Sequence, residues 1–162
     1  MKIAFKMKTY NILSIDEFKT NIGNNSRLLG IDPGNRNVGF AICDENKKVA
    51  TPLKIIEKTK FESLINEIIQ IIKDNDIKGI VVGNPINMDG TIGKSSRSAS
   101  DFAKKISINV TVPVSMWDER LSSEASFKIT KELGTNVTNR IDKLDKNAAA
   151  FILQGAIDYL SK

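Results

Sequence analysis

The sequence predicts an α/β domain, and three observations support this. Helical and strand-like patterns alternate along the chain. An apolar hairpin precedes the first strong helical pattern, and a short apolar run of the kind used for strands covered on both faces follows it. The chain has 162 residues, 41% of them hydrophobic, which suits a single domain with a substantial core.

The first 26 residues lack clear periodicity and end in a polar run over 21–26, which is typical of a loop. We interpret residues 1–26 as an N-terminal extension of uncertain structure. The folded domain is predicted to span residues 27–162.

A β-hairpin is predicted to open the domain. Apolar residues at 28–31 and at 38–42 flank a turn over 32–35, which places Asp32 at the mouth of the hairpin. A third strand is expected around residues 48–51, before Pro52 interrupts it.

The central part of the chain alternates between helix and strand. Apolar side chains recur at helical spacing over 61–72, which predicts an amphipathic helix. The apolar run 79–83 then predicts a buried strand reached by a parallel crossover. A second helix is indicated over 99–106, and a further buried strand over 110–117.

Two helices are predicted to complete the chain. Ser122 can cap a helix that runs to about Leu133, where Gly134 is a stop signal. The final helix is expected from about residue 142 to residue 160.

Composition excludes several classes of function. The chain has no histidine, so it can form neither a Ser-His-Asp nor a Cys-His relay, and it has no imidazole metal ligand. Its single cysteine, Cys43, excludes an internal disulfide and a Cys-rich zinc site, and is most simply a buried apolar residue in a reducing compartment. No stretch approaches the ~20 apolar residues of a membrane span, so we expect a cytoplasmic protein.

The charge balance favours a polyanionic partner. Lys and Arg number 24 against 19 Asp and Glu, which gives a formal charge of +5 and a pI near 9.3. This excess is a modest indication of nucleic-acid binding.

Acidic residues stand where an α/β sheet presents side chains to a ligand. Asp32 ends the first strand, Asp118 and Glu119 end the strand over 110–117, and Asp145 lies near the start of the last helix. Carboxylates gathered there would repel one another unless a cation neutralised them, and oxygen ligands favour Mg²⁺ or Mn²⁺. A two-metal site of this kind hydrolyses phosphodiesters without histidine.

Four segments, in order, resemble motifs of the YqgF/RuvX family. Residues 30–39 (GIDPGNRNVG) resemble the opening motif that this family shares with RuvC resolvases, although actin-like ATPases and sugar kinases open with a similar turn. The later motifs separate these groups. They are 82–91 (VGNPINMDGT), 118–125 (DERLSSEA) and 143–154 (KLDKNAAAFILQ).

The resemblance implies a ribonuclease-H-like three-layer fold, in which a mixed sheet has an antiparallel hairpin followed by parallel strands, with helices on both faces. It also implies a nuclease, proposed either to mature the 5′ end of pre-16S ribosomal RNA or to resolve Holliday junctions. Carried over, Asp32 would bridge the metals, Glu119 would be the second ligand and Asp145 the third. Asp118 competes for the second position. Because neighbouring side chains point to opposite faces of a strand, only one of the two acids is expected to contact the metal, and we favour Glu119.

The chain departs from the family pattern at two places. Asn84 stands where leucine is usual, and Ser122 and Ser123 replace two threonines. Neither change touches a proposed ligand.

Basic residues in or beside the expected site loops are candidates for phosphate contacts. The alternative interpretation is solvated surface charge. Trp117, next to the acidic pair, is interpreted as core rather than as a platform for base stacking. The basic candidates are Arg36, Lys94, Arg97 and Arg120.

The leading hypothesis is an Mg²⁺- or Mn²⁺-dependent endonuclease that acts on structured RNA, with pre-rRNA as first candidate and branched DNA as alternative. A second hypothesis is a catalytically inactive nucleic-acid-binding module whose acids are structural. An actin-like ATPase is disfavoured because the chain is long enough for only one lobe. The protein could be a monomer or a homodimer, and a two-fold dimer would suit the symmetry of a junction.

Overall fold

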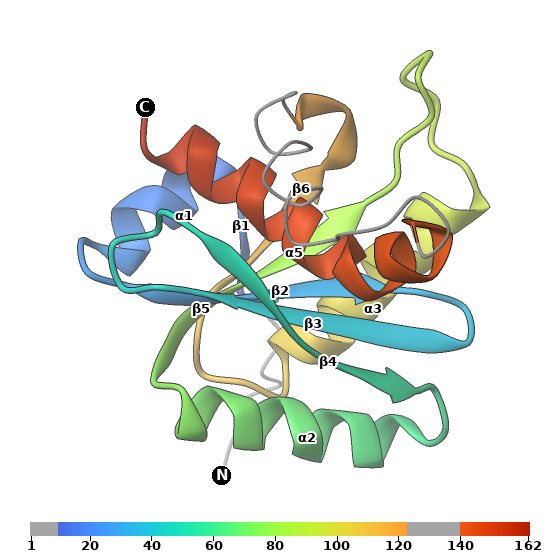
Figure 1. Cartoon of the computed structure of the whole chain (residues 1–162), viewed down its shortest axis with the longest axis horizontal. Coiled ribbons are helices and arrows are strands. Elements are labelled where there is room, and N and C mark those ends of the chain that lie inside the picture. Colours follow the sequence, from blue (N-terminus) through green and yellow to red (C-terminus); the bar gives the residue numbers. More distant parts are fainter. Residues whose placement is uncertain (1–9, 123–139) are drawn as a thin grey trace, which may run out of the picture.

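A six-stranded mixed sheet forms the centre of the computed structural model, which describes residues 10–122 and 140–162 (Figure 1). The strand order is β1-β6-β5-β2-β3-β4. The strands are β1 (Ile12–Leu13), β2 (Arg27–Pro33), β3 (Asn37–Cys43), β4 (Ala50–Glu57), β5 (Ile77–Asn84) and β6 (Val114–Asp118). The helices are α1 (Ile15–Ile22), α2 (Phe61–Asp74), α3 (Lys94–Ser107), the short 3₁₀ turn η1 (Glu119–Leu121) and α5 (Arg140–Leu160).

Strand pairing confirms the predicted hairpin and crossover. β2 pairs antiparallel with β3, and β3 with β4. β5 pairs parallel with both β2 and β6, and β6 also pairs parallel with β1. The α/β class and the mixed sheet are therefore as predicted.

Helices cover both faces of the sheet and give three layers (Figure 1). Leu29 and Ile31 of β2 pack in a core with α2 and α3, whereas Leu28 packs in a second core with α1 and α5. Because side chains alternate along a strand, Gly30 and Asp32 belong to the α5 face.

The predicted end of the third strand was wrong. We expected the strand to stop before Pro52, but β4 continues from Ala50 to Glu57 through it. β4 is an edge strand, where proline can be accommodated without breaking a ladder on both sides. The register also shifts opposite Pro52, between Phe40 and Ala41 of β3.

Other predicted boundaries differ by a few residues. The strand expected over 110–117 begins only at Val114, directly after Pro113. The last helix begins at Arg140, slightly before the expected start. The helix expected from Ser122 to about Leu133 lies outside the described residues beyond its first position.

Residues 12–22 contribute a strand and a helix to the fold. Ser14 caps α1, since its Oγ accepts a hydrogen bond from the Glu17 amide (3.2 Å) and donates one to Glu17 Oε1 (3.1 Å). Phe18 is fully buried, and a Cβ added to Gly79 would lie 2.6 Å from its ring. The division of the chain at residue 26 stays a prediction, but α1 covers part of the second core.

The α5 helix packs directly on the backbone of β2. A Cβ at Gly30 would lie 2.7 Å from Leu153 Cβ and 3.1 Å from the Ala149 carbonyl oxygen. We therefore predict that Gly30→Val lowers the free energy of unfolding by about 1–3 kcal/mol, measured by urea denaturation, because it overpacks this contact. Thr51→Val on the exposed edge strand is the control. Wild-type stability of Gly30→Val would mean that α5 has room to move away.

Burial confirms the interpretation of the single cysteine. Cys43 is 3% exposed, and its Sγ accepts a hydrogen bond from the Leu28 amide (3.3 Å). Burial raises the pKa of its thiol to about 11, so it is protonated and unreactive at neutral pH. Among the described helices, none is long and apolar enough to cross a membrane.

Candidate active site

Asp32 lies near the carboxyl end of β2, on the face covered by α5. Its antiparallel partner on β3 is Gly39, which has no side chain. A Cβ at Gly39 would lie 3.7 Å from Asp32 Cβ and 3.6 Å from Ala149 Cβ. The Asp32 carboxylate is therefore half-buried beside bare backbone, next to the part of α5 that carries Ala149.

Glu119 begins η1, immediately after β6. The pairing of Asn84 with Asp118 brings the ends of β5 and β6 to the same edge of the sheet as Asp32. Burial, together with the negative charges of Asp32 and Asp118, raises the pKa of Glu119 to about 6. The fold thus brings Asp32 and Glu119 within electrostatic reach of each other, across the intervening strand.

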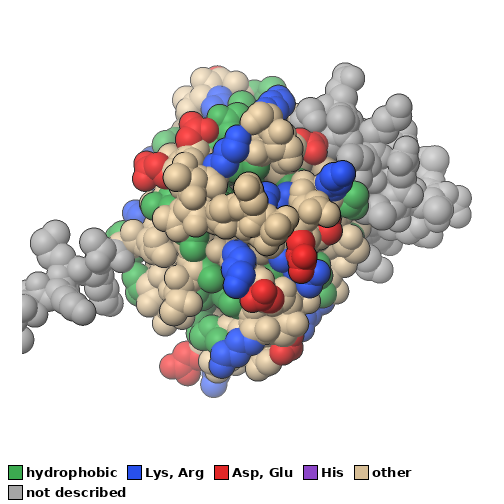
Figure 2. All heavy atoms as spheres, turned by 90° about the vertical axis from the view of Figure 1, so that its left-hand side faces the viewer, with side chains coloured by type: hydrophobic (Ala, Val, Ile, Leu, Met, Phe, Trp, Pro, Cys, Tyr) green, Lys and Arg blue, Asp and Glu red, His purple; other side chains and the backbone are tan. Residues whose placement is uncertain are grey.

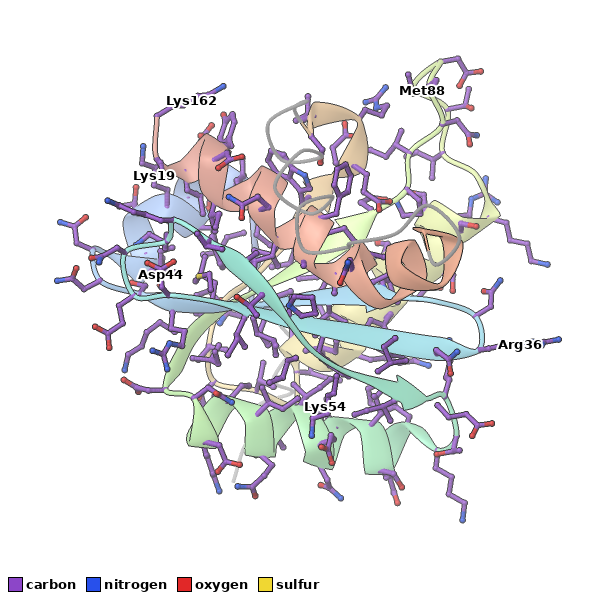
Figure 3. The ribbon with its side chains drawn as sticks, in the orientation of Figure 1. Lys19, Arg36, Asp44, Lys54, Met88 and Lys162 are labelled. Atoms are coloured by element: carbon purple, nitrogen blue, oxygen red, sulfur yellow. The ribbon has the colours of Figure 1, made fainter. Side chains whose placement is uncertain are left out.

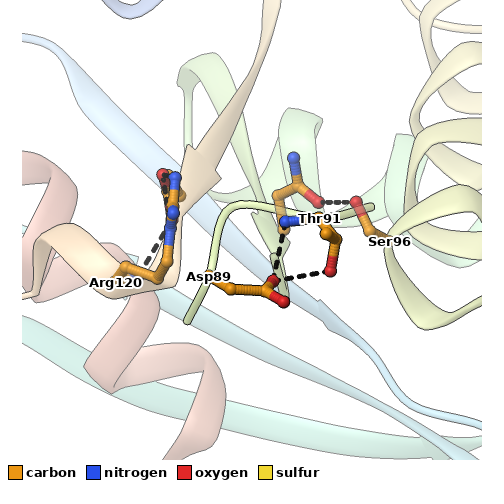
Figure 4. A network of polar contacts seen from close by, with 6 residues as sticks. Asp89, Thr91, Ser96 and Arg120 are labelled. Carbon is orange, nitrogen blue, oxygen red and sulfur yellow. Dashed lines mark hydrogen bonds and ion pairs between the residues drawn. The ribbon is translucent and has the colours of Figure 1, made fainter. Parts of the chain in front are cut away.

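Asp118 is held by its neighbour Arg120. Its Oδ2 lies 2.8 Å from Arg120 Nη2, and its Oδ1 accepts hydrogen bonds from the Arg120 amide and Nε, each at 3.0 Å (Figure 4). This hydrogen bonding lowers the pKa of Asp118. Asp118 therefore acts as the cap of η1, which supports Glu119 as the carboxylate that shares a site with Asp32.

Asp145 lies within α5, four residues before Ala149 and hence about one helical turn away. Its side chain lies outside the part of the chain that the structure describes. Among the described residues, no group of three acidic, cysteine or histidine side chains could hold a metal ion. A third ligand from α5 stays a prediction.

The two described carboxylates fit a divalent cation. Asp32 and Glu119 offer oxygen ligands, and their repulsion raises the pKa of Glu119. A cation between them would relieve that repulsion, and hard oxygen ligands suit Mg²⁺ and Mn²⁺.

The loop after β5 projects beside this edge. Asp89 Oδ1 accepts hydrogen bonds from the Thr91 amide (2.9 Å) and hydroxyl (2.6 Å), which closes a tight turn (Figure 4). Met88 stands at its tip and is 87% exposed (Figure 3). Asn84 has a structural role that was not predicted from the sequence. Its Oδ1 accepts a hydrogen bond from Ser96 Oγ (2.6 Å), which connects β5 to the first turn of α3.

The four basic candidates do not form one group. Arg36 lies at the tip of the β2–β3 turn and points outward (Figure 3). Arg120 is bound to Asp118. Lys94 and Arg97 lie on α3, where they line a cleft between α3 and the start of α2.

Trp117 belongs to the core, as interpreted from the sequence. It is 1% exposed, its Nε1 donates a hydrogen bond to Ser122 Oγ (3.1 Å), and its ring lies 5.7 Å from that of Tyr159. It is therefore not available for stacking with a base.

Glu119 should destabilise the metal-free protein at neutral pH. Its folded-state pKa lies above the ordinary value of 4.5, so the folded protein binds this proton more tightly than the unfolded chain, and stability falls as the pH rises from 4.5 to about 6. We expect Glu119→Gln in EDTA at pH 7.5 to raise the free energy of unfolding by about 1 kcal/mol, after allowance for the solvent that reaches the group. The gain should disappear at pH 4.5. Equal gains at both pH values would show that charge at Glu119 is not the cause.

The family assignment follows from sequence comparison. The sequence profile of RuvX, described as a Holliday junction resolvase, matches residues 26–159. The chain belongs to the RuvX family. RuvX relatives named "Putative pre-16S rRNA nuclease" include a protein from Pelagibacter ubique that is 49% identical over 93% of this chain and 99% of its own length. A relative of the same name from Ruegeria pomeroyi is 39% identical over 91% of this chain and 96% of its own length.

Solved structures agree with the RuvX assignment at the level of the fold. Thermus thermophilus RuvC in complex with a Holliday junction substrate superposes with a TM-score of 0.56, at 14% identity, over 83% of this chain and 94% of that chain. The structure of the same RuvC described without a substrate gives a TM-score of 0.53. The ribonuclease-H-like three-layer fold expected from the sequence is therefore confirmed.

Proposed function

We propose that this RuvX protein is a divalent-metal-dependent endonuclease of the two-metal type that processes the 5′ end of pre-16S ribosomal RNA. The observation that carries the proposal is the placement of Asp32 and Glu119 at the edge where β2, β5 and β6 end, close enough for the Asp32 charge to help raise the pKa of Glu119. The names of the curated relatives support pre-16S rRNA as the substrate. The absence of histidine is compatible with chemistry of this kind, because phosphodiester hydrolysis by metal-bound water needs no imidazole.

The proposed ligands are Asp32, Glu119 and Asp145. When bound, Mg²⁺ or Mn²⁺ would supply an activated water and a positive charge for the leaving oxygen. Asp32 is positioned by the β2–β3 pairing, and Glu119 by η1, whose first turn is held by the contact between Asp118 and Arg120. Because the pKa of Glu119 is raised in the metal-free protein, protons compete with the metal for this carboxylate, so cleavage at limiting metal concentration should decline as the pH falls.

The test compares substrates and metals directly. The purified protein is incubated with labelled pre-16S rRNA fragments that carry the 5′ flank, and with a four-way DNA junction, in Mg²⁺, Mn²⁺ or EDTA. We expect cleavage of the RNA near the mature 5′ end in either metal and none in EDTA. Cleavage of the junction alone would favour the resolvase that the family description names. Salt-sensitive binding without cleavage of either substrate would favour a binding module.

A further inference from the structure

A basic cleft opens between the start of α2 and the first turns of α3, on the face of the sheet away from Asp32. Its volume is about 450 Å³. The charged residues that line it are Lys58, Lys60, Lys94, Arg97, Lys105 and Asp101. Five cations therefore surround a single carboxylate.

None of these cations forms an ion pair with another described residue. The ion pairs among the described residues are Lys54 with Glu67, Lys78 with Asp76, and Arg120 with Asp118, and none involves a cation of the cleft. By contrast, Figure 2 shows acidic and basic side chains interspersed at the end of the molecule where α1 and the C-terminus lie. Positive charge concentrated around a hollow in this way is complementary to a polyanion.

The floor of the cleft is apolar. Phe61 and Phe102 meet edge to face, with ring centroids 6.5 Å apart, and Leu64 lies beside them. The Lys105 ammonium lies 5.6 Å from the centre of the Phe61 ring. Phe61 is partly exposed, whereas Phe102 and Leu64 are buried beneath it, so Phe61 is the aromatic side chain that a base can contact while phosphates contact the cationic rim.

Hydrogen bonds connect both sides of the cleft to the edge of the sheet that carries Asp32. On one side, the Lys58 amide donates a hydrogen bond to the carbonyl oxygen of Arg36, in the turn that follows Asp32 (2.7 Å). On the other, Ser96 of α3 is bonded to Asn84 at the end of β5. A single strand of nucleic acid that passes around this edge of the sheet can therefore contact the cleft and the acidic site together.

We propose that this cleft binds a single-stranded segment of the RNA substrate that flanks the cleaved bond. This inference rests on the proposed function for its choice of RNA. The volume of the cleft lies in the range that accommodates a ligand of about nucleotide size, which favours unpaired RNA over a duplex. The cleft thus adds a contact with the flank to the contacts made at the acidic site.

The test measures binding without cleavage. Fluorescence anisotropy with a labelled single-stranded RNA of 12 nucleotides is recorded for Asp32→Asn protein at several salt concentrations. The cleft variant adds Lys60→Gln and Arg97→Gln, and the matched control adds Lys19→Gln and Lys78→Gln, which remove the same charge at exposed sites elsewhere. Circular dichroism melting checks that all three proteins are folded.

We expect the cleft variant to bind on the order of tenfold more weakly at 0.1 M salt, with the slope of log K against log salt reduced by about 1.4, or 0.7 for each lost phosphate contact. The control should match the parent protein. An equal loss in the control, or an unchanged slope in the cleft variant, would overturn the inference. Failure of wild-type protein to cleave RNA while the cleft-dependent slope persists would count against the proposed function alone.

Discussion

Replacing Asp32 with asparagine should reduce the single-turnover rate of RNA cleavage on the order of 10³-fold. The substitution keeps the shape of the side chain but removes the charge that the proposed metal site requires. A metal-dependent stabilisation of about 4 kcal/mol corresponds to about three orders of magnitude in rate. The rate is measured with enzyme in excess over labelled precursor RNA, in Mg²⁺ and in Mn²⁺, at pH 7.5.

Asp76→Asn is the matched control for this substitution. Asp76 has a positive φ of 51°, a conformation that asparagine also tolerates, and its exposed ion pair with Lys78 contributes little to stability. The Asp76→Asn substitution therefore makes the same change of charge and shape at a position away from the acidic site. If Asp32→Asn and Asp76→Asn cleave at the same rate, Asp32 has no catalytic role.

Replacing Phe18 with alanine should lower the free energy of unfolding by about 3–5 kcal/mol. The Phe18 ring is fully buried against the backbone of Gly79, so its removal leaves a cavity between α1 and the sheet. Such a loss is a large fraction of the ~5–15 kcal/mol that stabilises a typical domain. Urea denaturation measured by circular dichroism gives the value.

Thr20→Ala provides the control on the same helix. Thr20 is exposed, and the change should alter stability by no more than about 0.5 kcal/mol. If Phe18→Ala is as stable as Thr20→Ala, then the packing of α1 on the sheet does not stabilise the fold.

The strand and helix pattern was predictable because it depends on local periodicity. The hairpin around Asp32 and the buried strand β5 each carry an unambiguous apolar pattern, and the crossover between them permits few topologies. Pro52 misled the prediction, because nothing local reveals that β4 is an edge strand. The pairing of β1 with β6 could not be predicted either, since β1 has only two residues, too few to show an alternation of apolar and polar side chains.

The acidic site was predictable in part. Strand ends indicated Asp32, Asp118 and Glu119, and the family resemblance favoured Glu119 over Asp118. The repulsion between Asp32 and Glu119 agrees with that choice. The bond from Arg120 to Asp118 could not be predicted, because charge alone does not distinguish a phosphate ligand from an internal partner. Lys94 and Arg97 of the basic cleft were candidates from the sequence, but the cleft itself was not predictable, since its cations come from segments about 35 residues apart that only the folded sheet brings together.

Manganese binding tests the central claim most directly. Electron paramagnetic resonance of free Mn²⁺ gives the amount bound to the wild-type protein and to Asp32→Asn, Glu119→Gln and Asp76→Asn. If Asp32 and Glu119 share a metal site, the wild-type protein and Asp76→Asn bind Mn²⁺, and the other two variants lose that binding. Equal binding of Mn²⁺ by all four proteins would contradict a metal site formed by Asp32 and Glu119.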